Sequence, residues 1–187
     1  MGRIIGVVGT RTLISVAEFD RLEVPEDKRY ELDDGELLVM TKPRYGHNRI
    51  VMRLTQALLA YLENHPIGEV LTADNLFVLG PGTKRIPDLS FLSAARVALI
   101  EDDEDIHGAP ELAIEVLSPS DTVAMMRRKV REYFTAGGKL VWLVYPESKE
   151  AEVWESPKGP TEILGVEQTL AAPAVLPGFS ILVKSLF

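Results

Sequence analysis

The sequence predicts an α/β fold, a mixed sheet with helices packed on it. Residues 46–64 carry apolar side chains at steps of three and four, which indicates an amphipathic helix. A second helix is expected over about 120–136, between Ser118-Pro119-Ser120 and Gly137-Gly138. Residues 139–146 form a nearly continuous apolar run, which is typical of a strand covered on both faces. Two helices and a doubly covered strand together favour a layered architecture.

The segments around these three elements supply the remaining strands. Residues 16–23 predict a short helix, and residues 29–40 predict a β-hairpin because apolar residues flank the turn sequence Asp33-Asp34-Gly35. Four more strands are expected, over residues 69–79, 87–92, 111–117 and 150–156. The predicted core order is helix, strand, strand, strand, helix, strand, with an N-terminal hairpin in front and short strands behind.

The length and composition narrow the class of protein. A chain of 187 residues fits one domain, with a core over about 28–155 and C-terminal strands over 156–187. It is 46% hydrophobic, enough apolar chain to bury a core. The absence of cysteine excludes disulfides, thiolate metal sites and a cysteine nucleophile.

Charge and hydropathy indicate where the protein works. The apolar patch IIGVV, residues 4–8, is far shorter than the ~20 residues of a membrane span. We therefore expect an N-terminal strand or arm there, no membrane association and a cytoplasmic protein. The formal net charge of −8 argues against a protein whose whole surface binds nucleic acid, although a local basic groove stays compatible with it.

Two carboxylates stand in strands that otherwise look built for a core. Asp88 precedes the apolar run of residues 89–92, and Glu115 lies between Ile114 and Val116. A buried carboxylate needs a partner, and two on adjacent strands repel unless a cation lies between them. Mg²⁺ is the natural candidate. Alternatively, Asp88 caps a turn after Pro87 and Glu115 pairs with an arginine.

The order Pro87-Asp88, Glu115 and a lysine in the following helix resembles the PD-(D/E)XK nuclease pattern. Longer stretches are similar to a bacterial family of endonuclease-like domains of unknown function, the Uma type: RYELDDGELLVM, His47 at a helix start, PDLSFLS, HGAPELAIEVLSPS and KVREYFTAGGKLVWLVYP. This resemblance covers about residues 28–155. It implies a restriction-endonuclease-like mixed sheet with flanking helices, and a Mg²⁺- or Mn²⁺-dependent endonuclease that hydrolyses phosphodiester bonds, with DNA as the expected substrate.

The resemblance also assigns roles to residues. It implies metal ligation by the side chains of Asp88, Glu115 and Glu36 and by the backbone carbonyl of Val116. Lys129 replaces the lysine that the pattern usually places two residues after the glutamate, where Leu117 stands here. It would orient or help to deprotonate the attacking water.

Other positions have weaker or competing interpretations. His47 is a candidate base or phosphate contact. Each of these side chains also has a plain structural interpretation: Glu36 as a turn residue, Lys129 as part of a solvated basic helix face and His47 as a structural histidine. Met125 stands where the family often has an aspartate, which would weaken the site, and Tyr145 stands where it often has one before the proline.

Basic residues supply possible contacts to DNA phosphates: Arg44, Arg49, Arg53, Lys84, Arg85, Arg127, Arg128 and Arg131. Nucleases of this fold often act as dimers, because cutting two strands needs two sites, so the resemblance makes a homodimer possible. The apolar tail from Val175 to Phe187 either covers the core or contributes to such a dimer. Three other functions stay open: a catalytically inactive binding or assembly module, a hydrolase of another phosphoester with a nucleotide-sized pocket, and, ranked last, a glycosidase.

Overall fold

The computed structural model describes residues 13–187 except 24, 26–27, 41 and 102–104. The predicted N-terminal strand falls on residues 1–12 and so lies outside the described residues. In the described part of the chain, no helix combines the length and the apolar character that crossing a membrane requires.

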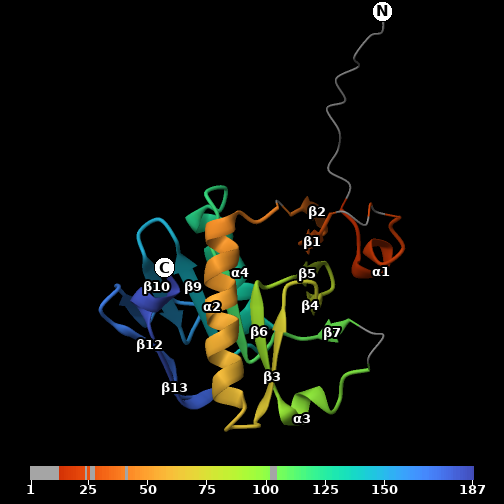
Figure 1. Ribbon diagram of the computed structural model, residues 1–187. Helices are drawn as coiled ribbons and strands as arrows, with labels where there is room; N and C mark the ends of the chain where they lie inside the picture. The colour runs from red at the N-terminus through yellow and green to blue at the C-terminus, as the bar shows by residue number, and fades with distance from the viewer. Residues whose placement is uncertain (1–12, 24, 26–27, 41, 102–104) are drawn as a thin grey trace, which may run out of the picture.

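The centre of the molecule is a six-stranded mixed sheet (Figure 1). Its β8 and β9 run parallel, and its other neighbouring strands are antiparallel. In spatial order the strands are β11 (Glu162–Leu164), β10 (Glu150–Trp154), β9 (Leu140–Tyr145), β8 (Leu112–Val116), β6 (Leu89–Ser93) and β3 (Gly68–Thr72). The predicted mixed sheet is thereby confirmed.

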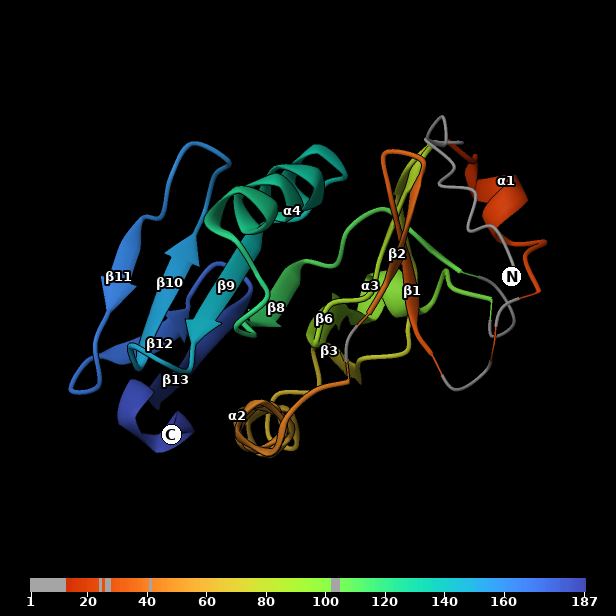
Figure 2. The same ribbon diagram turned by 90° about the horizontal axis from the view of Figure 1, so that it is seen from above.

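Two long helices cover opposite faces of this sheet, as the view from above shows (Figure 2). They are α2 (Tyr45–Leu62) and α4 (Val123–Thr135). The chain order α2, β3, β6, β8, α4, β9 reproduces the predicted core order, with β4, β5 and β7 inserted between β3 and β8. The side chains of β8 alternate, so one set packs towards α2 and the other towards α4.

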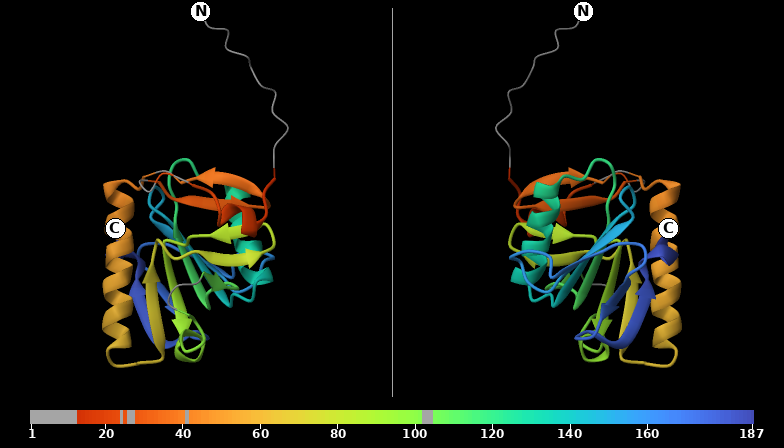
Figure 3. Two further views of the ribbon diagram at one scale, coloured as in Figure 1. Left: turned by 90° about the vertical axis from the view of Figure 1, so that its right-hand side faces the viewer. Right: turned by 90° about the vertical axis from the view of Figure 1, so that its left-hand side faces the viewer.

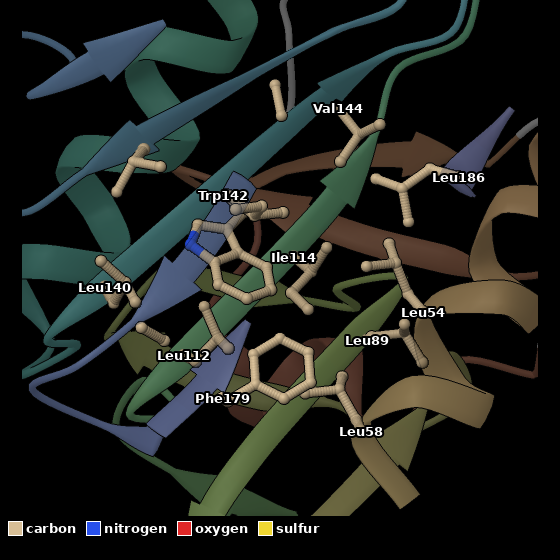
Figure 4. Close-up of a cluster of buried hydrophobic side chains, with 14 of the residues drawn as sticks. Leu54, Leu58, Leu89, Leu112, Ile114, Leu140, Trp142, Val144, Phe179 and Leu186 are labelled. Atoms are coloured by element: carbon tan, nitrogen blue, oxygen red, sulfur yellow. The ribbon is translucent and has the colours of Figure 1, made fainter. Parts of the chain in front are cut away.

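The larger core lies between the sheet and α2. Leu54 and Leu58 of α2 pack there against Leu89 and Trp142, and Phe179 stacks on the Trp142 ring at 6.1 Å (Figure 4). The C-terminal elements close this core: β12 (Thr169–Ala172), β13 (Leu176–Leu182) and a 3₁₀ turn (Val183–Leu186). Much of the apolar tail therefore covers the core, one of its two predicted roles.

A second, five-stranded sheet lies beside the first (Figure 3). Its spatial order is β2 (Glu36–Val39), β1 (Tyr30–Asp33), β5 (Thr83–Arg85), β4 (Phe77–Gly80) and β7 (Ile106–His107). The predicted hairpin is confirmed as β1–β2. Its two turn residues, Asp34 and Gly35, have φ values of 48° and 83°, as a type I′ turn requires. Two short helices, α1 (Val16–Phe19) and α3 (Ala94–Val97), complete the described elements.

One predicted strand is wrong. Residues 69–79 form two strands, β3 in the six-stranded sheet and β4 in the five-stranded sheet. The chain turns between them at Ala73–Leu76, where Asp74 has a φ of 112° and the Asn75 amide donates to the Thr72 carbonyl at 3.0 Å. The Ala73 N–H donates to the carbonyl of Asp88 at 3.1 Å. The turn therefore places Asp88 where the two sheets diverge.

Candidate active site

Glu115 reaches the site because strand side chains alternate. Its neighbours Ile114 and Val116 pack towards α2, so Glu115 points to α4, where only 5% of the residue stays exposed. Lys129 and Tyr133 lie one turn apart on α4 and face it. The Lys129 Nζ is 3.2 and 3.4 Å from the two carboxylate oxygens of Glu115, and the Tyr133 hydroxyl donates to Oε1 at 2.6 Å.

Asp88 immediately precedes β6, beside the end of β8. Its Oδ2 accepts a hydrogen bond from the backbone N–H of Val116 at 2.7 Å. The same oxygen lies 3.1 Å from Nε2 of His47, in the first turn of α2. The Nδ1 atom of His47 is buried and has no hydrogen-bond partner among the described residues. Two elements, β8 and α2, thus hold one carboxylate whose side chain is still 21% exposed.

These residues line one cavity of about 980 Å³. The structure brings five of the six predicted site residues together on its wall: Asp88, Glu115, Val116, Lys129 and His47. Glu36 is placed elsewhere. It begins β2 opposite Asp33, is half-buried and is not among the described residues that line the cavity. Tyr133 also contacts the site, because its hydroxyl donates to the Glu115 carboxylate.

Glu31 is the site residue that the sequence reasoning missed. Its Oε1 accepts hydrogen bonds from Lys129 Nζ at 3.1 Å and from the Ile86 N–H at 3.0 Å, and Oε2 accepts from Arg85 at 3.1 Å. The ammonium of Lys129 is therefore held between two buried carboxylates, Glu31 and Glu115. The alternation of β1 gave a signal, because Glu31 and Asp33 share the strand face opposite the buried Leu32.

The structure contradicts the expectation that Lys84 and Arg85 contact DNA phosphates. Arg85 is buried and forms ion pairs with Glu31, Asp33 and Glu132 at 2.8–3.1 Å. Its planar guanidinium suits this shared binding of carboxylates. The side chains of Lys84 and Arg85 both form ion pairs with acidic side chains of the protein, so neither is available to bind a DNA phosphate.

Lys84 is fully buried and pairs with Asp20 and Asp105, which ties α1 and the segment before β7 to β5. Asp33 also pairs with Arg128, whose side chain is 45% exposed. The remaining predicted cations lie on exposed or half-exposed positions: Arg44, Arg49, Arg53, Arg127 and Arg131. Of these, Arg44 lines the cavity, as do the exposed Lys28, Arg29 and Lys42.

Burial and neighbouring charges shift three pKa values in the site. Burial raises the pKa of the Glu115 carboxyl to about 7; Lys129 opposes this shift, and Asp88 and Glu31 add to it. Burial alone would lower the pKa of Lys129, but Glu115 and Glu31 outweigh it and raise that pKa, so the amine stays protonated. For His47, burial is likewise outweighed by Asp88, and its pKa is raised.

Asp88 and Glu115 fit a divalent cation that takes only one or two ligands from the protein better than one whose ligands all come from the protein. Among the described residues, no three His, Cys, Asp or Glu side chains are grouped closely enough to hold a metal by themselves. Asp88 and Glu115 do line the same cavity, and the charge of Asp88 raises the pKa of Glu115. Mg²⁺ is usually held by one or two carboxylates, with waters and substrate oxygens completing its shell. Lys129 contacts both oxygens of Glu115, so a cation would share that carboxylate with an ammonium.

Comparisons with known proteins agree with the fold. A family model described as "Uma2: Putative restriction endonuclease" matches residues 16–184. The crystal structure of "a putative nuclease belonging to DUF820" from Anabaena variabilis ATCC 29413 aligns with a TM-score of 0.80 at 20% identity, over 93% of this chain and 97% of that one. At this identity the likeness shows a shared fold, and it confirms the nuclease-like sheet. No curated protein matches the chain.

Proposed function

Because this chain belongs to the Uma2 family of putative restriction endonucleases, we propose that it is a metal-dependent endonuclease that hydrolyses phosphodiester bonds in DNA. One observation carries the proposal: Asp88, Glu115 and Lys129, which lie far apart in the sequence, line the same cavity. In this proposal Asp88 and Glu115 hold Mg²⁺ or Mn²⁺. The cation supplies polarisation of the phosphate and a bound water of lowered pKa.

The protein's own residues position the reactants. Lys129 stays protonated, because two carboxylates raise its pKa. Its role is therefore to hold the phosphate and orient the attacking water by charge. A protonated amine cannot accept the proton of that water, so Lys129 is not the general base. Glu31 and Tyr133 act as positioning residues, since Glu31 fixes the Lys129 ammonium and Tyr133 fixes the Glu115 carboxylate. A homodimer would supply the second site that a double-strand cut requires.

The test combines metal binding with DNA cleavage. Mg²⁺ and Mn²⁺ are titrated by calorimetry into the wild type and into an Asp88→Ala/Glu115→Ala variant, and both proteins are assayed on supercoiled plasmid. We expect the wild type to bind the metal and nick the plasmid, and the variant to do neither. Glu147→Ala is the control, because Glu147 is an exposed carboxylate on the same cavity and should leave both readouts unchanged. A wild type that binds no metal at millimolar concentration contradicts the proposal and favours the inactive binding module.

Metal binding should depend on pH through Glu115. Below its pKa of about 7 the carboxyl is protonated and must lose that proton to bind a cation. The apparent affinity for Mg²⁺ should therefore fall roughly tenfold per pH unit below 7 and level off above it. The Tyr133 hydrogen bond lowers this pKa, so Tyr133→Phe should shift the midpoint to higher pH. Calorimetry from pH 5.5 to 8.5 checks both, and a flat profile would contradict metal binding by a Glu115 carboxyl of raised pKa.

The cavity itself favours a second candidate, hydrolysis of a smaller phosphoester. A volume of about 980 Å³ is within the range for small-molecule sites. Assays on mononucleotide phosphodiesters and on p-nitrophenyl phosphate esters separate the two activities. The DNA proposal requires cleavage of the polymer to exceed that of these small esters.

A further inference from the structure

Apolar side chains form part of the cavity lining, beside its charged groups. Side chains from the end of β2, the segment before α2, the end of β8 and α4 meet there: Val39, Met40, Pro43, Leu117, Pro119 and Met126. Phosphate recognition alone needs no apolar surface, because it is served by cations and N–H donors. Apolar side chains beside polar groups are instead typical of sites that bind small organic ligands, such as a nucleotide with its base.

The reactive groups lie deep in this cavity. Glu115 and Lys129 are only 5% and 9% exposed. A stacked duplex carries its phosphates on a convex surface with the bases turned inward. A phosphate that approaches Glu115 and Lys129 from a strand would therefore bring its nucleotide away from the stack, and unstacking costs least where the base is already unpaired.

An exposed aromatic residue lies next to the cavity lining in the sequence. Tyr45, the first residue of α2, is 80% exposed and stands between Arg44 and Gly46, which both line the cavity, although Tyr45 itself is not among the lining residues. The guanidinium of Arg49 lies 5.8 Å from the centre of its ring. An aromatic ring beside cations is the usual platform for stacking the bases of single strands. Lys28, Lys42 and Arg44, which line the cavity, add positive charge that can bind the backbone of a strand.

We propose that the cavity is a subsite for one unpaired nucleotide, with Tyr45 stacking on a neighbouring base beside the cavity, so that the substrate is single-stranded or locally unpaired DNA. This proposal rests on the proposed nuclease function for its substrate. It goes beyond that function by naming the form of DNA that reaches the carboxylates and the residue that selects it.

The test measures binding without cleavage. One sequence is prepared as a fluorescein-labelled single strand, as a duplex and as a duplex with a three-nucleotide bulge, and anisotropy titrations are run in EDTA at low salt. The single strand and the bulge should bind at least tenfold more tightly than the duplex. Tyr45→Ala should weaken binding of these two forms roughly 5- to 150-fold, the range for losing one base–aromatic stack.

Two variants separate stacking from a general change in the helix. Tyr45→Phe should keep the single-strand preference, because the ring remains. Met52→Ala alters an exposed side chain about two turns further along α2, away from Arg44 and Gly46 of the cavity lining, and should change nothing. Equal affinity for all three forms, no measurable binding, or an unchanged Tyr45→Ala would each overturn the subsite.

The two proposals fail separately. Metal-dependent nicking together with duplex binding that ignores Tyr45 removes the subsite and leaves the nuclease. Tyr45-dependent binding of single strands without metal binding or nicking removes the nuclease and leaves a nucleotide-binding cavity.

Discussion

Replacing Lys129 by methionine is expected to slow DNA cleavage by about 10³-fold, within the range for removing a positioned charge or proton-transfer group from an active site. Methionine keeps much of the length of the chain but removes the ammonium held between Glu31 and Glu115. Single-turnover cleavage, with the enzyme in saturating excess over the DNA, measures the effect on the chemical step, apart from any change in binding.

Matched variants show whether the loss of cleavage rate comes from removing the Lys129 ammonium. Lys139→Met makes the same substitution at an exposed lysine just beyond α4 and should leave the rate unchanged. Glu31→Gln keeps Lys129 but weakens its fixed position, so an intermediate loss is expected, largest at subsaturating metal. A Lys129→Met protein that is folded by circular dichroism and cleaves at the wild-type rate would show that Lys129 belongs only to the buried ion network.

Replacing Arg85 by methionine is expected to lower the free energy of unfolding by about 3–5 kcal/mol, the usual cost of leaving buried charges without their partner. Arg85 is the common partner of Glu31, Asp33 and Glu132. Its removal leaves three carboxylates, two of them almost completely buried, to share Lys129 and Arg128. Urea unfolding followed by tryptophan fluorescence measures the change.

Arg128→Met provides the comparison within the same network. Arg128 pairs with Asp33 too, but its side chain is 45% exposed, so its loss should cost no more than about 1 kcal/mol. Equal costs for the two arginines would mean that burial does not govern this network. Arg85→Lys should fall between them, because a lysine keeps the charge but cannot reach several carboxylates with a planar fork.

The elements that the sequence predicts well are those in which local pattern and tertiary burial agree. The stripe of Ile50, Leu54 and Leu58 reads as a helix face, and these residues are buried under the sheet. The Asp34-Gly35 turn reads as a hairpin because few other residues tolerate positive φ at both positions. The prediction of one strand over residues 69–79 is wrong because two consecutive strands of similar apolar character look continuous in the sequence, although Asp74-Asn75 between them is a turn sequence.

The candidate site was predictable where a carboxylate contradicts its strand. Asp88 and Glu115 stand out among apolar neighbours, and the structure places both on the cavity wall. Arg85 and Lys84 lie on a short polar strand, which by itself looks solvent-exposed. The acidic partners of Arg85 lie 47–54 residues away in the sequence, and those of Lys84 lie 21 and 64 residues away. Sequence periodicity carries no information about such distant pairings.

The turn at Ala73–Leu76 limits how the length of this protein can change. It joins two sheets, in whose strands successive side chains point to opposite faces. Its Ala73 N–H also donates to the backbone carbonyl of Asp88. One added residue would turn every following side chain of β4 to the other face. The connection over residues 155–161, between β10 and β11, lies outside the cavity lining and holds no site residue. Insertions, reporter peptides and new loop contacts are therefore best introduced there, while the spacing between β3 and β4 has to be kept.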